Sequence, residues 1–191
     1  MAKKSGSAIF MYWVIGLCVA LAAVSFTLYY THTLRYAAVL WTGVTAFTVM
    51  YHFWGRIIMG NVTKLFGIRH DHPFFKPRKF EKKLYKLLRV RKWKEKVLTY
   101  DPEAFSVEKH TLEEIANTMS KAETDHWINE LISLSTLLFS LMWGNLWIFA
   151  STALLGMIFD AQFIVVQRYN RPTVQRLMAR KAQRASADLK I

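Results

Sequence analysis

Long uncharged apolar stretches constrain the fold of this chain more than any other feature of its sequence. Residues 8–30 carry no charge, residues 36–55 carry one histidine, and Glu130 and Asp160 are the only acids in residues 127–167. The chain is 53% hydrophobic but has a formal net charge of +13, so its apolar and charged residues are segregated along the sequence. A soluble domain cannot easily bury so much apolar surface, and a disordered chain would not contain it.

We therefore predict an all-α, polytopic membrane protein whose 191 residues form a single membrane domain. A transmembrane helix needs about 20 apolar residues, and the segment Trp143-Gly144-Asn145 divides the last stretch because Gly and Asn favour turns. The four expected transmembrane helices are about 8–30, 35–56, 126–142 and 146–168. A helical cytoplasmic insertion, 57–125, and a basic tail, 169–191, complete the predicted organisation.

The distribution of Lys and Arg predicts the orientation in the membrane. The segment 56–127 holds 16 of these residues and the tail from Arg168 holds seven, whereas the short segments near 31–35 and 143–145 hold only Arg35. Basic residues are enriched in cytoplasmic loops. We therefore expect a multi-pass protein of the cell membrane with both termini and the large insertion in the cytoplasm.

Two patterns predict helices within the insertion. In residues 78–98, apolar side chains recur every three or four positions among many lysines, which predicts an amphipathic helix on the membrane surface. Thr111 and Glu114 have the spacing of a capping box, so a second helix is expected to begin there. This helix would continue through Glu123 and His126 into the third apolar segment.

Glu123, His126 and Glu130 are spaced so that they lie on one face of this second helix. A carboxylate can orient a histidine ring and stabilise its charged form, so His126 beside Glu123 is a candidate general base. The alternative is an interfacial Glu/His pair that only anchors the helix. Glu-x-x-His also occurs in di-iron bundles, but those sites need two such motifs and this chain has one. We expect no metal ion and no bound cofactor.

A cluster of polar residues follows the last apolar stretch and ends at Pro172, which we expect to stop the helix. A single arginine at that position would be an ordinary membrane anchor, because its long side chain reaches the interface. Two arginines together with an amide and a phenol are more typical of a functional site. The cluster consists of Gln167, Arg168, Tyr169, Asn170 and Arg171.

Two ionisable residues lie inside the predicted apolar spans. His52 is four residues before Arg56, and Asp160 is eight residues before Arg168. Ionisable residues within a bilayer are costly and are functional candidates by default. We therefore expect both to contact substrate and to meet the Glu/His pair and the arginine cluster at the cytoplasmic side. The alternative is that Asp160 neutralises a buried arginine or histidine and only holds the helices together.

The surplus positive charge has three interpretations. Nucleic acid is not an expected partner, because the basic residues flank apolar spans and form no recognised binding module. Attraction to anionic membrane lipid is the simplest interpretation for the scattered lysines. The third is a docking surface for an acyl donor that carries phosphates, such as acyl-CoA or acyl carrier protein. The segment that best fits this last role consists of Arg91, Lys92, Trp93 and Lys94.

Three blocks of the chain also carry a family resemblance. They are VRKWK at residues 90–94 with KVL at 96–98, AE at 122–123 with HW at 126–127, and IVVQRYNRP at 164–172. In order and approximate spacing these blocks resemble the glycosyl-4,4′-diaponeurosporenoate acyltransferase family, over roughly residues 80–178. The resemblance implies a membrane enzyme of lipid or carotenoid biosynthesis. Such an enzyme transfers a fatty acyl group from an acyl donor to a hydroxyl of a lipid-linked acceptor, glycosylated or not.

The candidate residues and the resemblance together lead to a hypothesis about the mechanism. His126, oriented by Glu123, would remove the hydroxyl proton of the acceptor, and the acyl donor would dock on residues 91–94. The oxyanion of the transition state would be stabilised by Arg168, Asn170 or Arg171. The remaining substrate contacts are expected from Gln167, Tyr169, His52 and Asp160.

Two other functions stay open at this point. A non-enzymatic scaffold or accessory subunit would use the basic cytoplasmic face to bind lipid headgroups or an acidic partner. Transfer of a methyl or phosphoryl group to a membrane lipid is the other possibility, which the lack of a glycine-rich phosphate loop in the sequence weakens.

Overall fold

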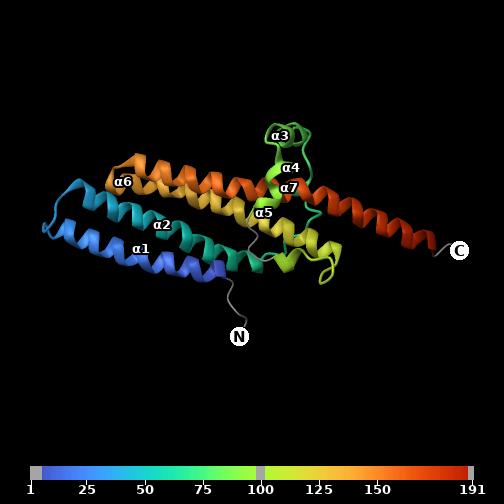
Figure 1. The fold of residues 1–191 in the computed structure, drawn as a ribbon, viewed down its shortest axis with the longest axis horizontal. Helices are drawn as coiled ribbons and strands as arrows, with labels where there is room; N and C mark the ends of the chain where they lie inside the picture. The colour runs from blue at the N-terminus through green and yellow to red at the C-terminus, as the bar shows by residue number, and fades with distance from the viewer. Residues whose placement is uncertain (1–5, 98–101, 189–191) are drawn as a thin grey trace. The chain divides into compact units, whose positions relative to one another are not determined.

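The computed structural model describes residues 6–97 and 102–188, and every regular element in these ranges is a helix (Figure 1). The prediction of an all-α fold is confirmed for this part of the chain. The contacts divide the chain into two units, which are described separately. The first unit consists of Met1–Val62 and Trp127–Asp160, and the second of Thr63–His126 and Ala161–Ile191. The single membrane domain stays a prediction.

The first unit is built around α1 (Gly6–Tyr30) and α2 (Ala37–Val62), which pack side by side (Figure 1). Its other elements are the later part of α5 (Leu112–Ser135), η5 (Thr136–Phe139), α6 (Ser140–Trp143) and the start of α7 (Leu146–Asp188). Val44, Ile148 and Phe149 form its buried apolar centre. The partly buried apolar residues around this centre are Phe26, Leu40, Leu137, Phe139 and Trp143.

The turn between α6 and α7 is formed by Gly144 and Asn145, which both have positive φ, 64° and 49°. Glycine adopts this conformation without a steric penalty, and asparagine tolerates it better than most residues. The Asn145 side-chain amide donates to the carbonyl of Trp143 at 2.8 Å and accepts from Trp41 Nε1 at 3.0 Å. The predicted turn at Trp143-Gly144-Asn145 is confirmed.

Among the described residues, two helices are long and apolar enough to cross a membrane, Ile9–Tyr30 and Leu146–Ala187. By this criterion the prediction of four spans is wrong, since neither 35–56 nor 126–142 qualifies. The apolar residues of α2 alternate with threonines, a histidine and an arginine. Residues 126–142 do not form one helix, because α5 ends at Ser135 and the chain then passes through η5 and α6. The orientation of the termini stays a prediction.

The predicted helix end at Pro172 is also wrong, because α7 continues through this residue to Asp188. Most of the predicted basic tail is therefore helical. Proline removes one N–H donor, here the one that would bond the carbonyl of Arg168, but its fixed φ is compatible with a helix. The lost bond affects one carbonyl in a helix of 43 residues, so the rest of the helix can hold the turn in place.

The second unit contains several short helices before the two long ones. They are η1 (Thr63–Leu65), η2 (Pro73–Phe75), α3 (Glu81–Leu87), α4 (Val90–Trp93), η3 (Lys94–Lys96) and η4 (Pro102–Phe105). The continuous amphipathic helix predicted for 78–98 is wrong within the described residues, because the chain breaks at Arg89. This residue has a left-handed φ of 50°, and its N–H donates to the carbonyl of Lys86 at 3.2 Å, which closes α3.

The capping box predicted at the start of α5 is confirmed. The N–H of Thr111 donates to Glu114 Oε2 at 2.8 Å, and the N–H of Glu114 donates to Thr111 Oγ1 at 3.2 Å. The bond from the Thr111 backbone also lowers the pKa of the Glu114 carboxyl from its usual value. α5 begins at the next residue after Thr111, Leu112, as this cap requires.

The close contact of α1 and α2 depends on a small residue. A Cβ atom added at Gly43 would lie 3.0 Å from the Phe26 ring and 3.1 Å from Ser25 Cβ, whereas one added at Gly16 would meet nothing within 4 Å. Small residues allow the backbones of two helices to approach closely. We expect Gly43→Ala to lower the free energy of unfolding by about 1–3 kcal/mol, the usual cost of overpacking. Unfolding would be followed by titrating the detergent-solubilised protein with SDS. Gly16→Ala is the matched control, and equal stability of the two variants would contradict this close packing.

Candidate functional site

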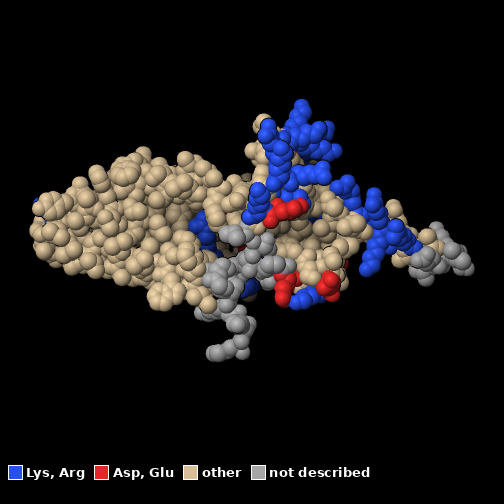
Figure 2. Space-filling view, viewed as in Figure 1, with Lys and Arg blue, Asp and Glu red and all other residues tan. Residues whose placement is uncertain are grey.

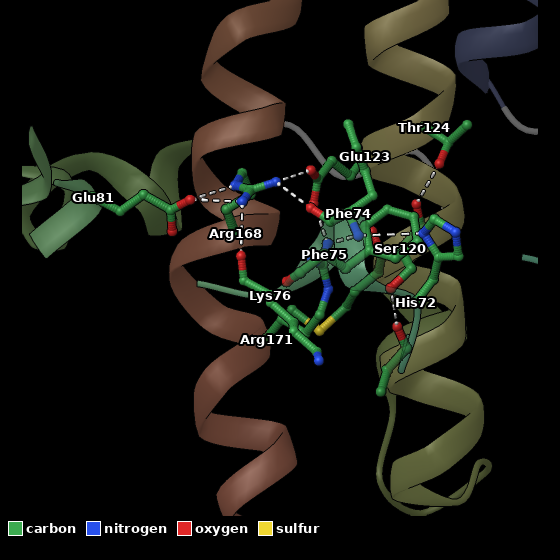
Figure 3. Close-up of polar contacts among 12 residues, drawn as sticks. His72, Phe74, Phe75, Lys76, Glu81, Ser120, Glu123, Thr124, Arg168 and Arg171 are labelled. Carbon is green, nitrogen blue, oxygen red and sulfur yellow. Dashed lines mark hydrogen bonds and ion pairs between the residues drawn. The ribbon is translucent and has the colours of Figure 1, made fainter. Parts of the chain in front are cut away.

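Four charged residues of the second unit form a buried ion cluster, Glu81, Glu123, Arg168 and Arg171 (Figure 3). Arg168 extends between the two glutamates, donating to Glu81 Oε1 from Nε at 2.9 Å and from Nη2 at 2.6 Å, and to Glu123 Oε1 from Nη1 at 2.6 Å. Arg171 Nη2 pairs with Glu123 Oε2. The two carboxylates and the two guanidinium groups balance each other in charge.

These four side chains are almost entirely withdrawn from solvent. The exposed fraction of the side chain is 0% for Glu123, 1% for Arg171, 5% for Glu81 and 11% for Arg168. Removing a charge from water costs several kcal/mol, which only good geometry and further hydrogen bonds offset. The cluster is therefore stable only as a complete set, and loss of one member leaves an opposite charge buried without its partner.

The loop before α3 supplies backbone acceptors to both arginines. Arg168 donates to the carbonyls of Phe74 at 3.4 Å and Lys76 at 3.3 Å, and Arg171 donates to that of Phe75 at 3.2 Å. The Arg171 guanidinium also lies 4.8 Å from the centre of the Phe75 ring. Pro73 begins η2, and the two prolines of this segment prevent a longer helix that would bond these carbonyls internally.

Arg168 and Arg171 differ in whether a guanidinium N–H group is left without an acceptor. A guanidinium has five N–H groups. Arg168 makes five bonds, two to Glu81, one to Glu123 and two to backbone carbonyls, so it has no donor left. Arg171 Nε is buried and has no partner among the described residues. Of the two arginines, Arg171 therefore holds the spare donor.

A second set of contacts joins the basic segment to the polar cluster that follows residue 166. Lys94 Nζ donates to Asn170 Oδ1 at 3.1 Å and lies 5.5 Å from the centre of the Tyr169 ring. Tyr169 meets the ring of Tyr85 edge-on at 5.3 Å, and the Tyr85 hydroxyl donates to Glu81 Oε2 at 2.9 Å. Burial raises the pKa of the Tyr85 phenol, and its bond to Glu81 raises it further.

The other predicted substrate-binding residues of this unit lie apart from these contacts. Arg91 and Lys92 are exposed to solvent, and Gln167 is half-buried. The indole of Trp93 donates to the carbonyl of Leu88 at 2.8 Å, which fixes the end of α3 against α4. Of the predicted docking segment, Lys94 is thus the residue that contacts the polar cluster.

His126 lies one turn after Glu123 on α5, and its ring stacks on that of Phe163 with centroids 4.5 Å apart and an angle of 4° between the planes. Both carboxylate oxygens of Glu123 accept from the arginines of the buried ion cluster. The predicted role of Glu123 in orienting His126 stays a prediction.

His52 and Asp160 belong to the first unit and lie in a separate polar group. Asp160 is paired with Arg56 Nη2 and accepts from Asn129 Nδ2 at 3.1 Å, and His52 Nδ1 lies 3.3 Å from Ser133 Oγ. Asp160 is fully buried and His52 is 5% exposed. The pairing of Asp160 with an arginine is the arrangement expected for a residue that holds helices together. Contact of either residue with substrate stays a prediction.

Glu81 and Arg56 belong to these groups but were not predicted as site residues. One weak sequence signal points to Glu81 as a partner of basic residues: residues 76–96 contain eleven Lys and Arg but only two acids. The alternative role of Asp160 requires a buried arginine as its partner, but no sequence pattern identifies Arg56 as that arginine. Within the described parts of the chain, no group of three His, Cys, Asp or Glu side chains is arranged to hold a metal ion.

We expect the stability of the second unit to depend on the buried ion cluster. Glu123→Gln keeps the size of the side chain but leaves Arg168 with the carboxylate of Glu81 and removes the carboxylate that pairs with Arg171. We expect a loss of about 3–5 kcal/mol in the free energy of unfolding, the usual cost of breaking a buried ion pair. Glu95→Gln, at an exposed position of the second unit, is the matched control. If SDS titration gave the two variants the same stability, the cluster would not hold this unit together.

A family model described as glycosyl-4,4′-diaponeurosporenoate acyltransferase matches residues 71–180, which is more than half of the chain and includes the whole buried ion cluster and His126. No curated protein and no solved structure shows significant similarity to the chain. The resemblance of the three sequence blocks is confirmed by this match, and the chain belongs to the glycosyl-4,4′-diaponeurosporenoate acyltransferase family.

Proposed function

We propose that this protein is a membrane O-acyltransferase. It moves a fatty acyl group from a cytoplasmic thioester donor, acyl-CoA or acyl carrier protein, to a hydroxyl of a lipid-linked acceptor. The observation that carries the proposal is the family match over residues 71–180, which includes the buried ion cluster. The two helices long and apolar enough to cross a bilayer support an acceptor that resides in the membrane.

In the proposed reaction His126 is the general base. It takes the proton of the acceptor hydroxyl as the oxygen attacks the thioester carbonyl, and the resulting tetrahedral oxyanion collapses with loss of the thiolate. The departing thiolate accepts this proton from His126, so the products are an ester and a free thiol. Arg171 Nε or the Asn170 amide would donate to the oxyanion.

Arg168 has a different part in this proposal. Its five donors are already bonded, so it would have to break a bond to contact an oxyanion. We assign it as a positioning residue that holds Glu81 and Glu123 in place. Glu123 in turn fixes Arg171, whose Nε is the donor that we assign to the reaction.

A non-enzymatic scaffold is the alternative, and one observation favours it. The buried ion cluster is balanced in charge and well bonded, which is also what a purely structural ion network requires. The scaffold would bind lipid headgroups or an acidic partner through its exposed lysines. Mass spectrometry of membrane lipids from cells with and without the gene separates the two, because only the enzyme produces a new ester-linked lipid.

The first prediction of the enzyme proposal concerns the base. His126→Ala should lower formation of the ester-linked lipid by about 10²–10⁴-fold, the usual contribution of general base catalysis. The amount of protein in the membrane should be unchanged. His110→Ala, at an exposed histidine of the same unit, is the control and should keep normal activity. Near-normal activity of His126→Ala would remove His126 from the mechanism.

The second prediction concerns the donor. Lys94→Gln removes the charge that contacts Asn170 and Tyr169, whereas Lys92→Gln removes an exposed charge two residues away. If Lys94 guides the donor phosphates, its variant should raise KM for the acyl donor by about tenfold, as expected for the loss of one charge-assisted hydrogen bond of about 1.5 kcal/mol. Steady-state kinetics with purified protein measure this. Equal KM values for the two variants would argue against donor docking at Lys94.

A further inference from the structure

The α3 helix buries one charged residue and leaves apolar residues at its two ends exposed, unlike a typical surface helix of a soluble protein. Such a helix normally buries its apolar stripe and exposes its charges. In α3 the buried residue is the charged one, Glu81, whose whole residue is 4% exposed. Phe80 is 57% exposed, Leu87 is 80% exposed and Leu88 is 42% exposed. The apolar residues at the two ends of α3 are therefore exposed, whereas Leu84 between them is half-buried.

Basic side chains surround these apolar residues. Lys79, Lys82, Lys83 and Lys86 are all exposed, and Figure 2 shows Lys and Arg gathered over α3 and α4. We call Phe80, Leu87 and Leu88 together with these four lysines the α3 surface. Apolar residues flanked by lysines are typical of helices that lie in the headgroup region of a bilayer.

The α3 surface is held firmly in the second unit. Glu81 accepts two hydrogen bonds from Arg168 of α7, and the left-handed Arg89 closes the helix. Val90, directly after the break, is fully buried. The exposed leucines are thus presented by a fixed short helix whose charged residue is buried in the ion cluster.

We infer that the α3 surface is a docking surface for anionic membrane lipid. Phe80, Leu87 and Leu88 enter the headgroup region, and the four lysines bind lipid phosphates. Charge complementarity selects this partner, because each basic residue near an anionic bilayer contributes binding energy that a neutral bilayer does not supply. The same chain contains two helices able to cross a bilayer, so the local concentration of lipid is high. The inference concerns where the second unit binds and does not depend on acyl transfer.

A single labelled cysteine tests the inference in the full-length protein. Cys18 is the one cysteine of the chain, so Cys18→Ser provides a background for Leu87→Cys, labelled with the environment-sensitive fluorophore NBD. The protein is reconstituted in phosphatidylcholine vesicles with or without phosphatidylglycerol. With the anionic lipid we expect a blue-shifted emission and quenching by nitroxide-labelled lipid. Val107→Cys, at a position 72% exposed in the same unit, is the matched control and should stay unquenched.

A second variant isolates the role of charge. Replacement of Lys79, Lys82, Lys83 and Lys86 by Gln should reduce quenching at position 87 to the level seen in neutral vesicles. Quenching at position 87 no greater than at position 107 would overturn the inference. So would equal quenching in neutral and anionic vesicles, or full quenching in the four-lysine variant. A blue shift that requires added acyl-CoA or acyl carrier protein would instead assign the surface to the acyl donor.

Discussion

The carboxylate of Glu123 is the contact on which the second unit depends. One of its oxygens accepts from Arg168 and the other pairs with Arg171, and no part of the side chain is exposed. Through Arg168 the same network reaches Glu81 on α3 and the carbonyls before it. Two long helices, a short helix and a proline-rich loop are thus joined at one buried group. Because a buried charge without a partner is so costly, these elements must assemble together.

The first unit follows the same physical rule with other residues. Asp160 is fully buried and paired with Arg56, and Asn129 donates to its second oxygen. In both units a buried acid takes an arginine and at least one further donor. Each unit also has a buried arginine Nε with no partner among the described residues, Arg56 in the first unit and Arg171 in the second. Of these two arginines Arg171 lies within the family match, which is why we propose the chemistry there.

Local features of the fold could be predicted from the sequence. The capping box at Thr111 and the turn at Gly144 were correct, because each depends on residues within one or two turns of the chain. Two predictions of where a helix ends or continues were wrong, because more than the local residue type decides them. Pro172 does not end α7, because one lost hydrogen bond matters little in a long helix. The break in the helix predicted for 78–98 was also missed. The residue that adopts the left-handed conformation there is Arg89, whereas such a break is usually predicted from a glycine.

The sequence alone determined that the chain is helical and that Glu123, His126, Arg168 and Arg171 belong to a recognisable acyltransferase pattern. It predicted four membrane spans, whereas the structure has two helices long and apolar enough to cross a bilayer among its described residues. Only the tertiary structure decided which charges pair. Glu81 and Arg168 are separated by 87 positions, and no spacing rule connects residues so far apart. Helix periodicity and capping act over a few residues, whereas an ion pair depends on how distant segments pack. The structure therefore assigned Arg168 to bonding within the protein and left the free donor on Arg171.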